Sequence, residues 1–331
     1  MNALKFTILS FCLIIFFFLN LFVGSVNIPF ETVMASLRGA GEGAENFIII
    51  NNRLPMAITS LLGGSALAMA GLLLQTAFRN PLAGPSILGI TSGASLGVAL
   101  VMLLFGGTIT AGALSVSGYA AVIAGAFAGS ILIMGILLAL SAILRNDLML
   151  LIAGIMIGYI VSSAITLLNY SSTAQSLQGY VMWGMGTFNG VALRQLPFFS
   201  ILIFAGLLLS FMLMKPLDLL LLGDSYAKNL GLNLTRIRNI LLLATGILTA
   251  TATAYCGPVS FIGLAVPHIA RLIFPTDIHR TIMPATALTG GAVALICSFI
   301  CVLPDGGVIP LNAVTPLIGA PVVIWVILRK K

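Results

Sequence analysis

Long apolar runs that carry almost no charged side chains recur along the whole chain. Because the hydrocarbon core of a bilayer is about 30 Å thick, a helix needs roughly 20 apolar residues to cross it. Spanning β-barrels instead alternate apolar and polar residues along strands of about ten residues. Of the 331 residues, 60% are hydrophobic and only 7% are charged, which leaves a soluble fold too little polar surface. We therefore predict an all-α polytopic membrane protein.

Ten of these runs are bounded by charged residues, proline or glycine, which mark the ends of spanning helices. The eighth run is short for a full crossing, so we expect a half-helix that neighbouring protein supports. We favour a retained first span over a cleaved signal peptide, because the first run exceeds a typical signal segment. One transmembrane domain over residues 1–331 is predicted. The runs are 6–26, 54–78, 86–105, 116–141, 148–169, 195–214, 236–256, 259–272, 283–303 and 311–328.

Lysine and arginine residues stand singly at the ends of the apolar runs. If both termini are cytoplasmic, only Arg38, Arg53 and Arg194 of the 15 basic residues lie outside. Short cytoplasmic loops carry an excess of Lys and Arg, so this distribution predicts cytoplasmic termini and supports the count of ten. The basic residues form no stripe with interleaved aromatics, so we expect no nucleic-acid partner.

Small residues recur four positions apart within several runs, on one face of each expected helix. Such pairs let helix backbones approach closely in lipid. We expect them to pack helices within the chain, and the alternative is that some form a subunit interface. The pairs are Gly64 with Ala68, Gly125 with Gly129, and Gly154 with Gly158.

The sequence offers no nucleotide or metal motif: neither GxxxxGK[ST] nor HExxH occurs. We therefore expect no enzyme activity, no cofactor and no metal site in this chain. Cys297 and Cys301 share a helical face, but without nearby histidine or carboxylate they are expected to fill the core. His268 and His279 are placed near the cytoplasmic face, where we expect solvated or interfacial side chains.

The predicted spans are almost free of charge. Ion-coupled carriers place ionisable residues inside spans, where burial is costly. The energy source is therefore expected in a separate soluble motor protein.

The longest polar segment on the inner side is 215–239, the coupling segment. Pro216 and Gly223 bracket one short helix, and Asp224 is placed to cap a second that ends at Gly231. Two short helices along the cytoplasmic face would form a docking surface. An ordinary connecting loop is the alternative.

Five ordered strings resemble the FecCD-type permeases, the membrane subunits of ABC importers for iron-siderophore complexes, haem and vitamin B12. Together they span nearly the whole chain. They are Arg53-Leu-Pro followed by Gly71 to Gln75; Phe78-Arg-Asn-Pro-Leu-Ala-Gly-Pro85 with Leu88 to Ala94; Leu222-Gly-Asp through Leu230-Gly231; Gly257 to His268; and Ala313-Val-Thr through Gly319-Ala-Pro321.

The resemblance implies a type II importer permease in a bacterial cytoplasmic membrane. Such a subunit pairs with a second copy, here expected as a homodimer, or with a close paralogue. Two cytoplasmic ATPases, which bind the ATP and Mg²⁺, drive it, and a periplasmic or lipoprotein binding protein delivers the chelate.

The resemblance also assigns roles to residues of this chain. The fifth and tenth helices are expected to line the translocation pathway, and Arg53 is expected to dock the binding protein. Met56, Leu303 and Val308 depart from the family's docking pattern, so Arg194, Glu42, Glu45 and Asp305 are alternative contributors. The expected ATPase-coupling residues are Gly223, Asp224, Ala227, Leu230 and Gly231, and the expected pathway residues are Ile152, Met156, Tyr159, Val314 and Leu317.

Two other readings stay open from the sequence. Spans two to five and seven to ten would have opposite orientations, as in an ion-coupled secondary carrier with two inverted halves. An intramembrane enzyme would need paired polar residues deep in a span. Ser162, Ser163 and Thr166 are the candidates, although such hydroxyls usually bond backbone carbonyls within their own helix.

Overall fold

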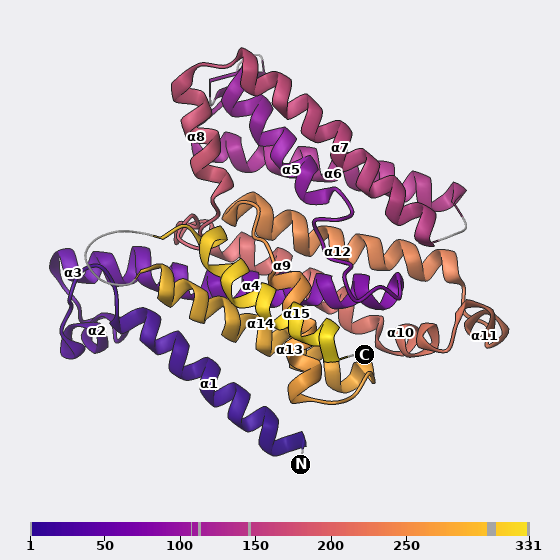
Figure 1. Cartoon of the computed structure of the whole chain (residues 1–331). Helices are drawn as coiled ribbons and strands as arrows, with labels where there is room; N and C mark the ends of the chain where they lie inside the picture. Colours follow the sequence, from indigo (N-terminus) through magenta and orange to yellow (C-terminus); the bar gives the residue numbers. More distant parts are fainter. Residues whose placement is uncertain (1, 107, 112–113, 145–146, 303–308, 330–331) are drawn as a thin grey trace.

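Helices form nearly all of the structure, as the apolar runs predict (Figure 1). The computed structural model describes residues 2–106, 108–111, 114–144, 147–302 and 309–329. The elements are α1 Asn2–Phe22, α2 Phe30–Leu37, α3 Gly43–Ile48, a π-helical turn Ile49–Arg53, α4 Leu54–Ala77, α5 Ile90–Ala99, a π-helical turn Leu100–Leu104, β1 Thr108–Ala111, β2 Leu114–Ser117, α6 Tyr119–Ile143, α7 Asp147–Ser171, α8 Ala174–Gly184, α9 Leu196–Met212, α10 Met214–Leu221, α11 Asp224–Asn229, α12 Leu234–Cys256, α13 Ile262–Ile273, α14 His279–Cys301 and α15 Leu311–Arg329.

The apolar helices correspond one to one with the predicted spans. Within the described ranges, six helices are long and apolar enough to cross a bilayer, and α9 with α10 adds a pair bent by 48°. The shorter apolar helices are α5 with its π-helical turn, α13 and α15. The short eighth span is confirmed, because α13 has only 12 residues. Most predicted ends agree with the structure to within a few residues.

Helix α4 lies at the centre of the bundle and is buried on nearly all sides. It touches α14 so closely that a Cβ added to Gly64 would lie 2.3 Å from the carbonyl oxygen of Gly290. A Cβ on Gly71 would lie 1.7 Å from the carbonyl oxygen of Gly263 in α13. Because lipid gives helices no hydrophobic reason to associate, contact of this kind supplies the attraction.

Helices α5, α6 and α7 form a second group above the central helices in Figure 1. A Cβ on Gly97 of α5 would lie 1.9 Å from the carbonyl oxygen of Gly125 in α6. Gly154 of α7 lies against Leu88, just before α5. The predicted small-residue pairs therefore pack helices within the chain.

The structure adds elements at the outer ends that the apolar pattern did not predict. The strands β1 and β2 pair antiparallel, and α8 begins where the side chain of Thr173 accepts a hydrogen bond from the backbone N–H of Ser176. A continuous helix runs into α4 from Gly43. Its π-helical turn ends two residues before Pro55, which has no N–H to donate to the helix.

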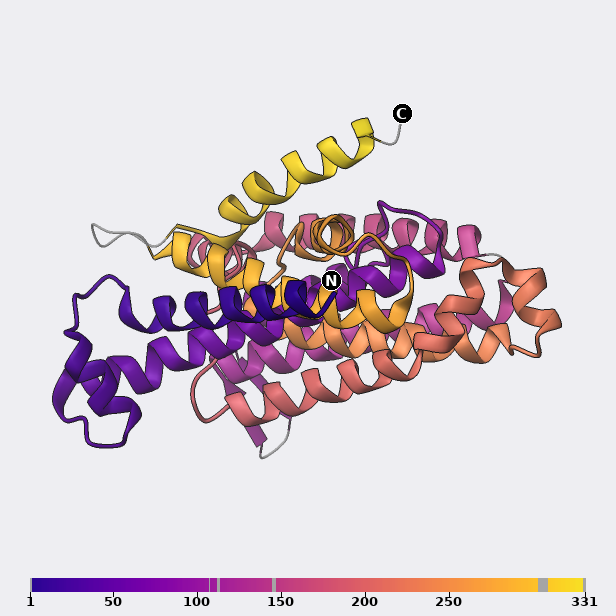
Figure 2. The ribbon, with the colours of Figure 1, turned by 90° about the horizontal axis from the view of Figure 1, so that it is seen from below.

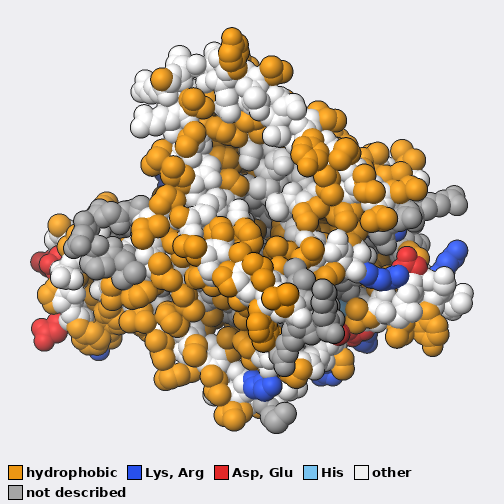
Figure 3. Space-filling view, in the orientation of Figure 1, with side chains coloured by type: hydrophobic (Ala, Val, Ile, Leu, Met, Phe, Trp, Pro, Cys, Tyr) orange, Lys and Arg blue, Asp and Glu red, His pale blue; other side chains and the backbone are white. Residues whose placement is uncertain are grey.

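We call the end of the bundle that carries α10 and α11 the inner end, because residues predicted to be cytoplasmic gather there. Lys5 Nζ donates to the carbonyl of Ile273 at 2.7 Å. Figure 3 shows lysine and arginine on this side of a mostly apolar surface, with acidic side chains also at the opposite end. Helix α1 packs along α14, and α15 lies against α13 and α14 (Figure 2).

Substitution of Gly71 by alanine should lower the thermal unfolding temperature of the detergent-purified protein by several degrees. The added methyl group has no room between α4 and α13, and overpacking of this kind costs about 1–3 kcal/mol. Gly135→Ala is the matched control, because it adds the same methyl group to α6 where nothing lies within 4 Å. Equal unfolding temperatures for the two variants would contradict the proposed constraint.

Candidate functional site

The coupling segment forms two short helices at the inner end, α10 and α11, as predicted. Gly223 separates them with a φ of +105°, a backbone conformation that residues with a Cβ rarely adopt. Gly223 occupies the N-cap position of α11, and Asp224 is the first residue inside the helix. The predicted capping role of Asp224 is therefore wrong, because its carboxylate instead pairs with Arg79, just beyond α4.

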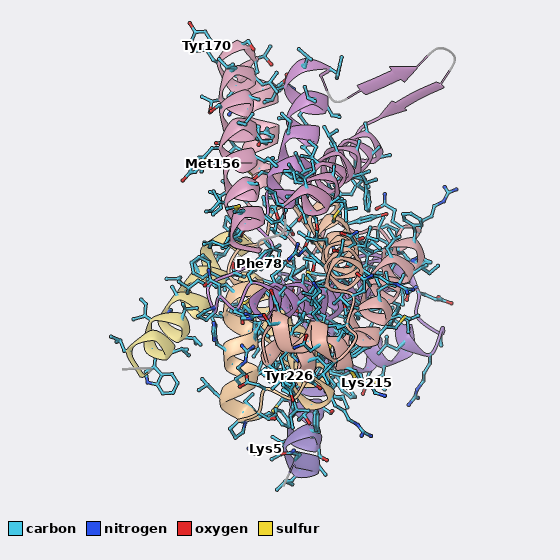
Figure 4. The ribbon with its side chains drawn as sticks, turned by 90° about the vertical axis from the view of Figure 1, so that its right-hand side faces the viewer. Lys5, Phe78, Met156, Tyr170, Lys215 and Tyr226 are labelled. Carbon is cyan, nitrogen blue, oxygen red and sulfur yellow. The ribbon has the colours of Figure 1, made fainter. Side chains whose placement is uncertain are left out.

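The segment presents an apolar surface at the inner end, which Figure 4 views directly. Leu222, Tyr226 and Leu230 are exposed, whereas Ala227 is fully buried. Ala227 therefore packs α11 onto the bundle, while its neighbours remain accessible. A groove of about 710 Å³ lies beside α11 and is lined by polar and apolar residues, which include Asp224, Lys228 and Leu234.

A partly buried chain of hydrogen bonds attaches α10 to the bundle. One carboxylate oxygen of Asp218 accepts hydrogen bonds from the backbone N–H of His279, at 2.9 Å, and from its Nδ1, at 2.7 Å. His279 Nε2 lies 3.1 Å from the hydroxyl oxygen of Thr76, in the last turn of α4. Three segments far apart in sequence therefore meet at one imidazole.

We expected solvated or interfacial histidines from the sequence, and the structure shows that neither is solvated. His279 is 1% exposed and His268 is 5% exposed. His268 Nε2 lies 2.8 Å from the carbonyl oxygen of Pro81. Each imidazole replaces water with protein partners at the inner end, and nothing in the local sequence identifies those partners.

Arg53 also lies differently from the outward-facing position expected for docking. It is 4% exposed, and its Nη1 donates to the carbonyls of Leu21 and Phe22 at 2.9 and 3.0 Å. Its Nη2 donates to the carbonyl of Val26. The guanidinium thus satisfies backbone carbonyls at and beyond the end of α1.

The alternative docking residues that the structure describes lie around the same outer end. Glu42 and Arg194 are exposed, and Met56 is buried. Leu303, Asp305 and Val308 lie outside the described residues. A cavity of about 330 Å³ opens beside Arg53 and Met56, between the ends of α1, α4, α14 and α15.

The expected pathway residues divide into exposed and buried positions. Ile152, Met156 and Tyr159 are exposed on α7, and Leu317 is exposed on α15, whereas Val314 is buried. Met156 points away from the bundle in Figure 4, on the side where α15 also lies. The four exposed residues can face a pathway in this arrangement, whereas Val314 could do so only if α15 moved.

The hydroxyl groups considered for an intramembrane enzyme form hydrogen bonds within their own helix. Ser163 donates to the carbonyl of Tyr159 at 3.0 Å, and Thr166 donates to that of Ser162 at 2.9 Å. Residues 93–97 have the GxSxG spacing of a hydrolase nucleophile turn, but they lie inside α5, where Ser95 donates to the carbonyl of Thr91. These hydroxyl groups donate to backbone carbonyl groups of their own helices.

A family model for the FecCD transport family matches residues 12–329. This chain belongs to the FecCD transport family. The vitamin B12 import system permease protein BtuC of Salmonella typhi is 37% identical over 278 residues, which cover 84% of this chain and 82% of that protein. BtuC of Escherichia coli O9:H4 (strain HS) is 36% identical over 280 residues, which cover 84% and 83% of the two chains.

Solved structures share the fold of this chain. One, described as a metal-chelate type ABC transporter in an inward-facing conformation, matches with a TM-score of 0.85 and 27% identity over 100% of both chains. PsaBC from Streptococcus pneumoniae in complex with Fab matches with a TM-score of 0.53 and 14% identity, over 82% of this chain and 90% of that chain. The second likeness concerns the fold alone. A FecCD-family fold with these relatives identifies a multi-pass permease of the ABC importer type.

Replacing Arg53 with methionine should destabilise this FecCD-family permease, because carbonyls beyond α1 lose a buried cationic donor. Hydrogen bonds from charged groups contribute about 1.5–3 kcal/mol, so the thermal unfolding temperature should fall by several degrees. Arg38→Met removes an exposed arginine at the same end and serves as the control. An unchanged unfolding temperature for Arg53→Met would show that Arg53 is available for another role.

Proposed function

We propose that this chain is the permease subunit of an ABC importer that carries a metal chelate into a bacterial cell across the cytoplasmic membrane. The chelate class comprises iron-siderophore complexes, haem and cobalamin. The observation that carries the proposal is the exposed coupling segment at the inner end of a FecCD-family bundle. A relative named for vitamin B12 import and a metal-chelate type transporter support the substrate class.

The distribution of charge supports an external energy source. The ion pairs among the described residues, Arg79–Asp224, Arg271–Asp277 and His279–Asp218, all lie at the inner end. Proton- or sodium-coupled carriers need ionisable groups deep in their spans. Two cytoplasmic ATPase subunits, which bind ATP and Mg²⁺, therefore fit this chain better than ion coupling in an inverted-repeat carrier.

The exposed apolar faces of α7 and α15 support a second permease copy. Leu167 and Tyr170 on α7, and Leu317 and Trp325 on α15, are exposed. A dimer that brings these faces around one pathway would give a wide, mostly apolar conduit, suited to releasing a bulky chelate. Selectivity would then reside in a periplasmic or lipoprotein binding protein that docks at the outer end.

Asp224→Arg should abolish the stimulation of ATP hydrolysis by the binding protein in the reconstituted complex. The substitution places a second cation beside Arg79 and reverses the charge at the start of α11, where we place the ATPase contact. Asp277→Arg places the same side chain at the inner end outside the coupling segment, and it should leave stimulated hydrolysis within about two-fold of wild type, because an exposed ion pair contributes little. Retained stimulation in Asp224→Arg would remove the docking role.

The permease reconstituted alone in liposomes should move no substrate against a gradient. Uptake of a labelled chelate should require the ATPase subunits, internal ATP and the binding protein together. The ligand that the purified binding protein retains, measured by calorimetry with each chelate class, would identify the substrate. Concentrative uptake by the permease without nucleotide would instead favour a secondary carrier.

A further inference from the structure

The two short helices of the coupling segment are attached to the bundle in different ways. The Arg79–Asp224 pair joins α11 to the region just beyond α4, but both side chains are about half exposed. Exposed ion pairs contribute little, because water screens them and two flexible side chains must be ordered. The polar attachment that reaches a buried group is the one through Asp218 of α10: its own side chain is 38% exposed, but that of its partner His279 is only 2% exposed.

Asp218 caps the start of α14 although it belongs to another helix. The residue before α14, Ile278, makes no side-chain capping bond. The carboxylate of Asp218 accepts the backbone N–H of His279 in its place, at 2.9 Å. The positive end of a helix dipole favours a carboxylate at this position, so α10 is held at the N-terminus of α14.

His279 extends this attachment to α4. An ionised Asp218 can only accept hydrogen bonds, so the 2.7 Å contact places a proton on Nδ1. In the neutral imidazole, Nε2 then accepts from the hydroxyl of Thr76, at 3.1 Å. Both His279 and Thr76 are buried. Breaking the chain would leave buried polar groups without partners.

The two helices that receive these contacts form a closely packed pair. A Cβ on Gly290 of α14 would lie 2.5 Å from both the carbonyl oxygen of Gly64 and the Cβ of Ala68 in α4. Packing this close leaves little room for α4 and α14 to slide independently. A displacement of α10 that pulls on Asp218 is therefore passed to both helices together.

We propose that His279 is a positioning residue that fixes α10 to the α4–α14 pair, so that a movement imposed on the coupling segment moves the centre of the bundle. The inference rests on the proposed function, because it requires an ATPase that acts on this segment. The Asp218–His279–Thr76 chain is the mechanical link between the docking surface and the membrane helices.

The test is the ratio of chelate molecules transported to ATP molecules hydrolysed by the complete importer in liposomes. Asp218→Asn, His279→Ala and Thr76→Val should each lower this ratio by about five- to tenfold, which lies within the roughly two- to thirtyfold range of coupling changes along such networks. Hydrolysis stimulated by the binding protein should stay within about two-fold of wild type, because the exposed ATPase-docking surface is unchanged.

Two further variants separate a link from a general packing effect. His279→Asn keeps an N–H donor near the position of Nδ1. Its ratio of transport to hydrolysis should therefore be closer to the wild-type value than that of His279→Ala. The double variant Thr76→Val with Asp218→Asn should lose no more than the larger single loss, because the two contacts act in series.

Thr289→Val is the matched control. Thr289 is buried in the same helix α14, but its hydroxyl donates only to the carbonyl of Ala285 at 2.7 Å. The variant should therefore transport at the wild-type ratio. Equal recovery of the ATPase subunits with each purified permease would establish that every complex is assembled.

The outcomes are distinguishable. Wild-type ratios of transport to hydrolysis in all three link variants would overturn the inference. A parallel fall of uptake and hydrolysis with a lowered unfolding temperature would also overturn it, because that result indicates a structural role only. If the His279→Ala complex does not assemble, the ratio measured for Thr76→Val decides between these outcomes, because that substitution removes only one hydroxyl group. A wild-type complex without ATP-dependent uptake would instead refute the proposed function, and this inference with it.

Discussion

Close backbone contact around α4 is the constraint on which the rest of the structure depends. Helices in lipid gain nothing from burying apolar side chains against each other, so they associate through tight packing and hydrogen bonds. Gly64 and Gly71 let α14 and α13 reach the backbone of α4. The helices that pack directly on α4, among them α9, α12, α13 and α14, form the fixed centre. Helix α15 projects from one side of this centre (Figure 2), whereas α7 lies above it and α10 and α11 lie at its inner end (Figure 1).

The spanning helices could be predicted because apolar length is a property of the local sequence. The fixed thickness of the bilayer turns that length into a helix with known bounds, and even the short α13 was identified in this way. Outside the hydrocarbon layer this constraint ends. The hairpin of β1 and β2, and the extension of α4 back to Gly43, had no comparable signal. Thr173 before α8 did offer a capping signal, but apolar length carries no information about a helix cap.

Only the parts of the candidate site that glycine residues delimit could be predicted from the sequence. Gly223 and Gly231 mark the ends of the short helices, whose existence follows from local sequence. The partners of the polar side chains do not follow from local sequence. Asp218 and His279 are 61 positions apart, and Thr76 is 203 positions from His279. Arg53 shows the same limit. A basic residue at the outer end of a span usually faces water, and only the course of the chain after α1 reveals the carbonyls that surround it.

The two kinds of contact at the edge of the bundle suit two mechanical tasks. Apolar faces such as those of α7 and α15 have no directional bonds, so one face can slide over another at little cost while staying in contact. Hydrogen bonds between buried groups fix both distance and angle, and losing one leaves an unsatisfied polar atom. A subunit that must change the shape of its pathway while following the movement of a partner needs both. In this chain the exposed apolar faces lie along the side of the bundle. The directional hydrogen bonds lie at the inner end, between α10 and the closely packed helices α4 and α14.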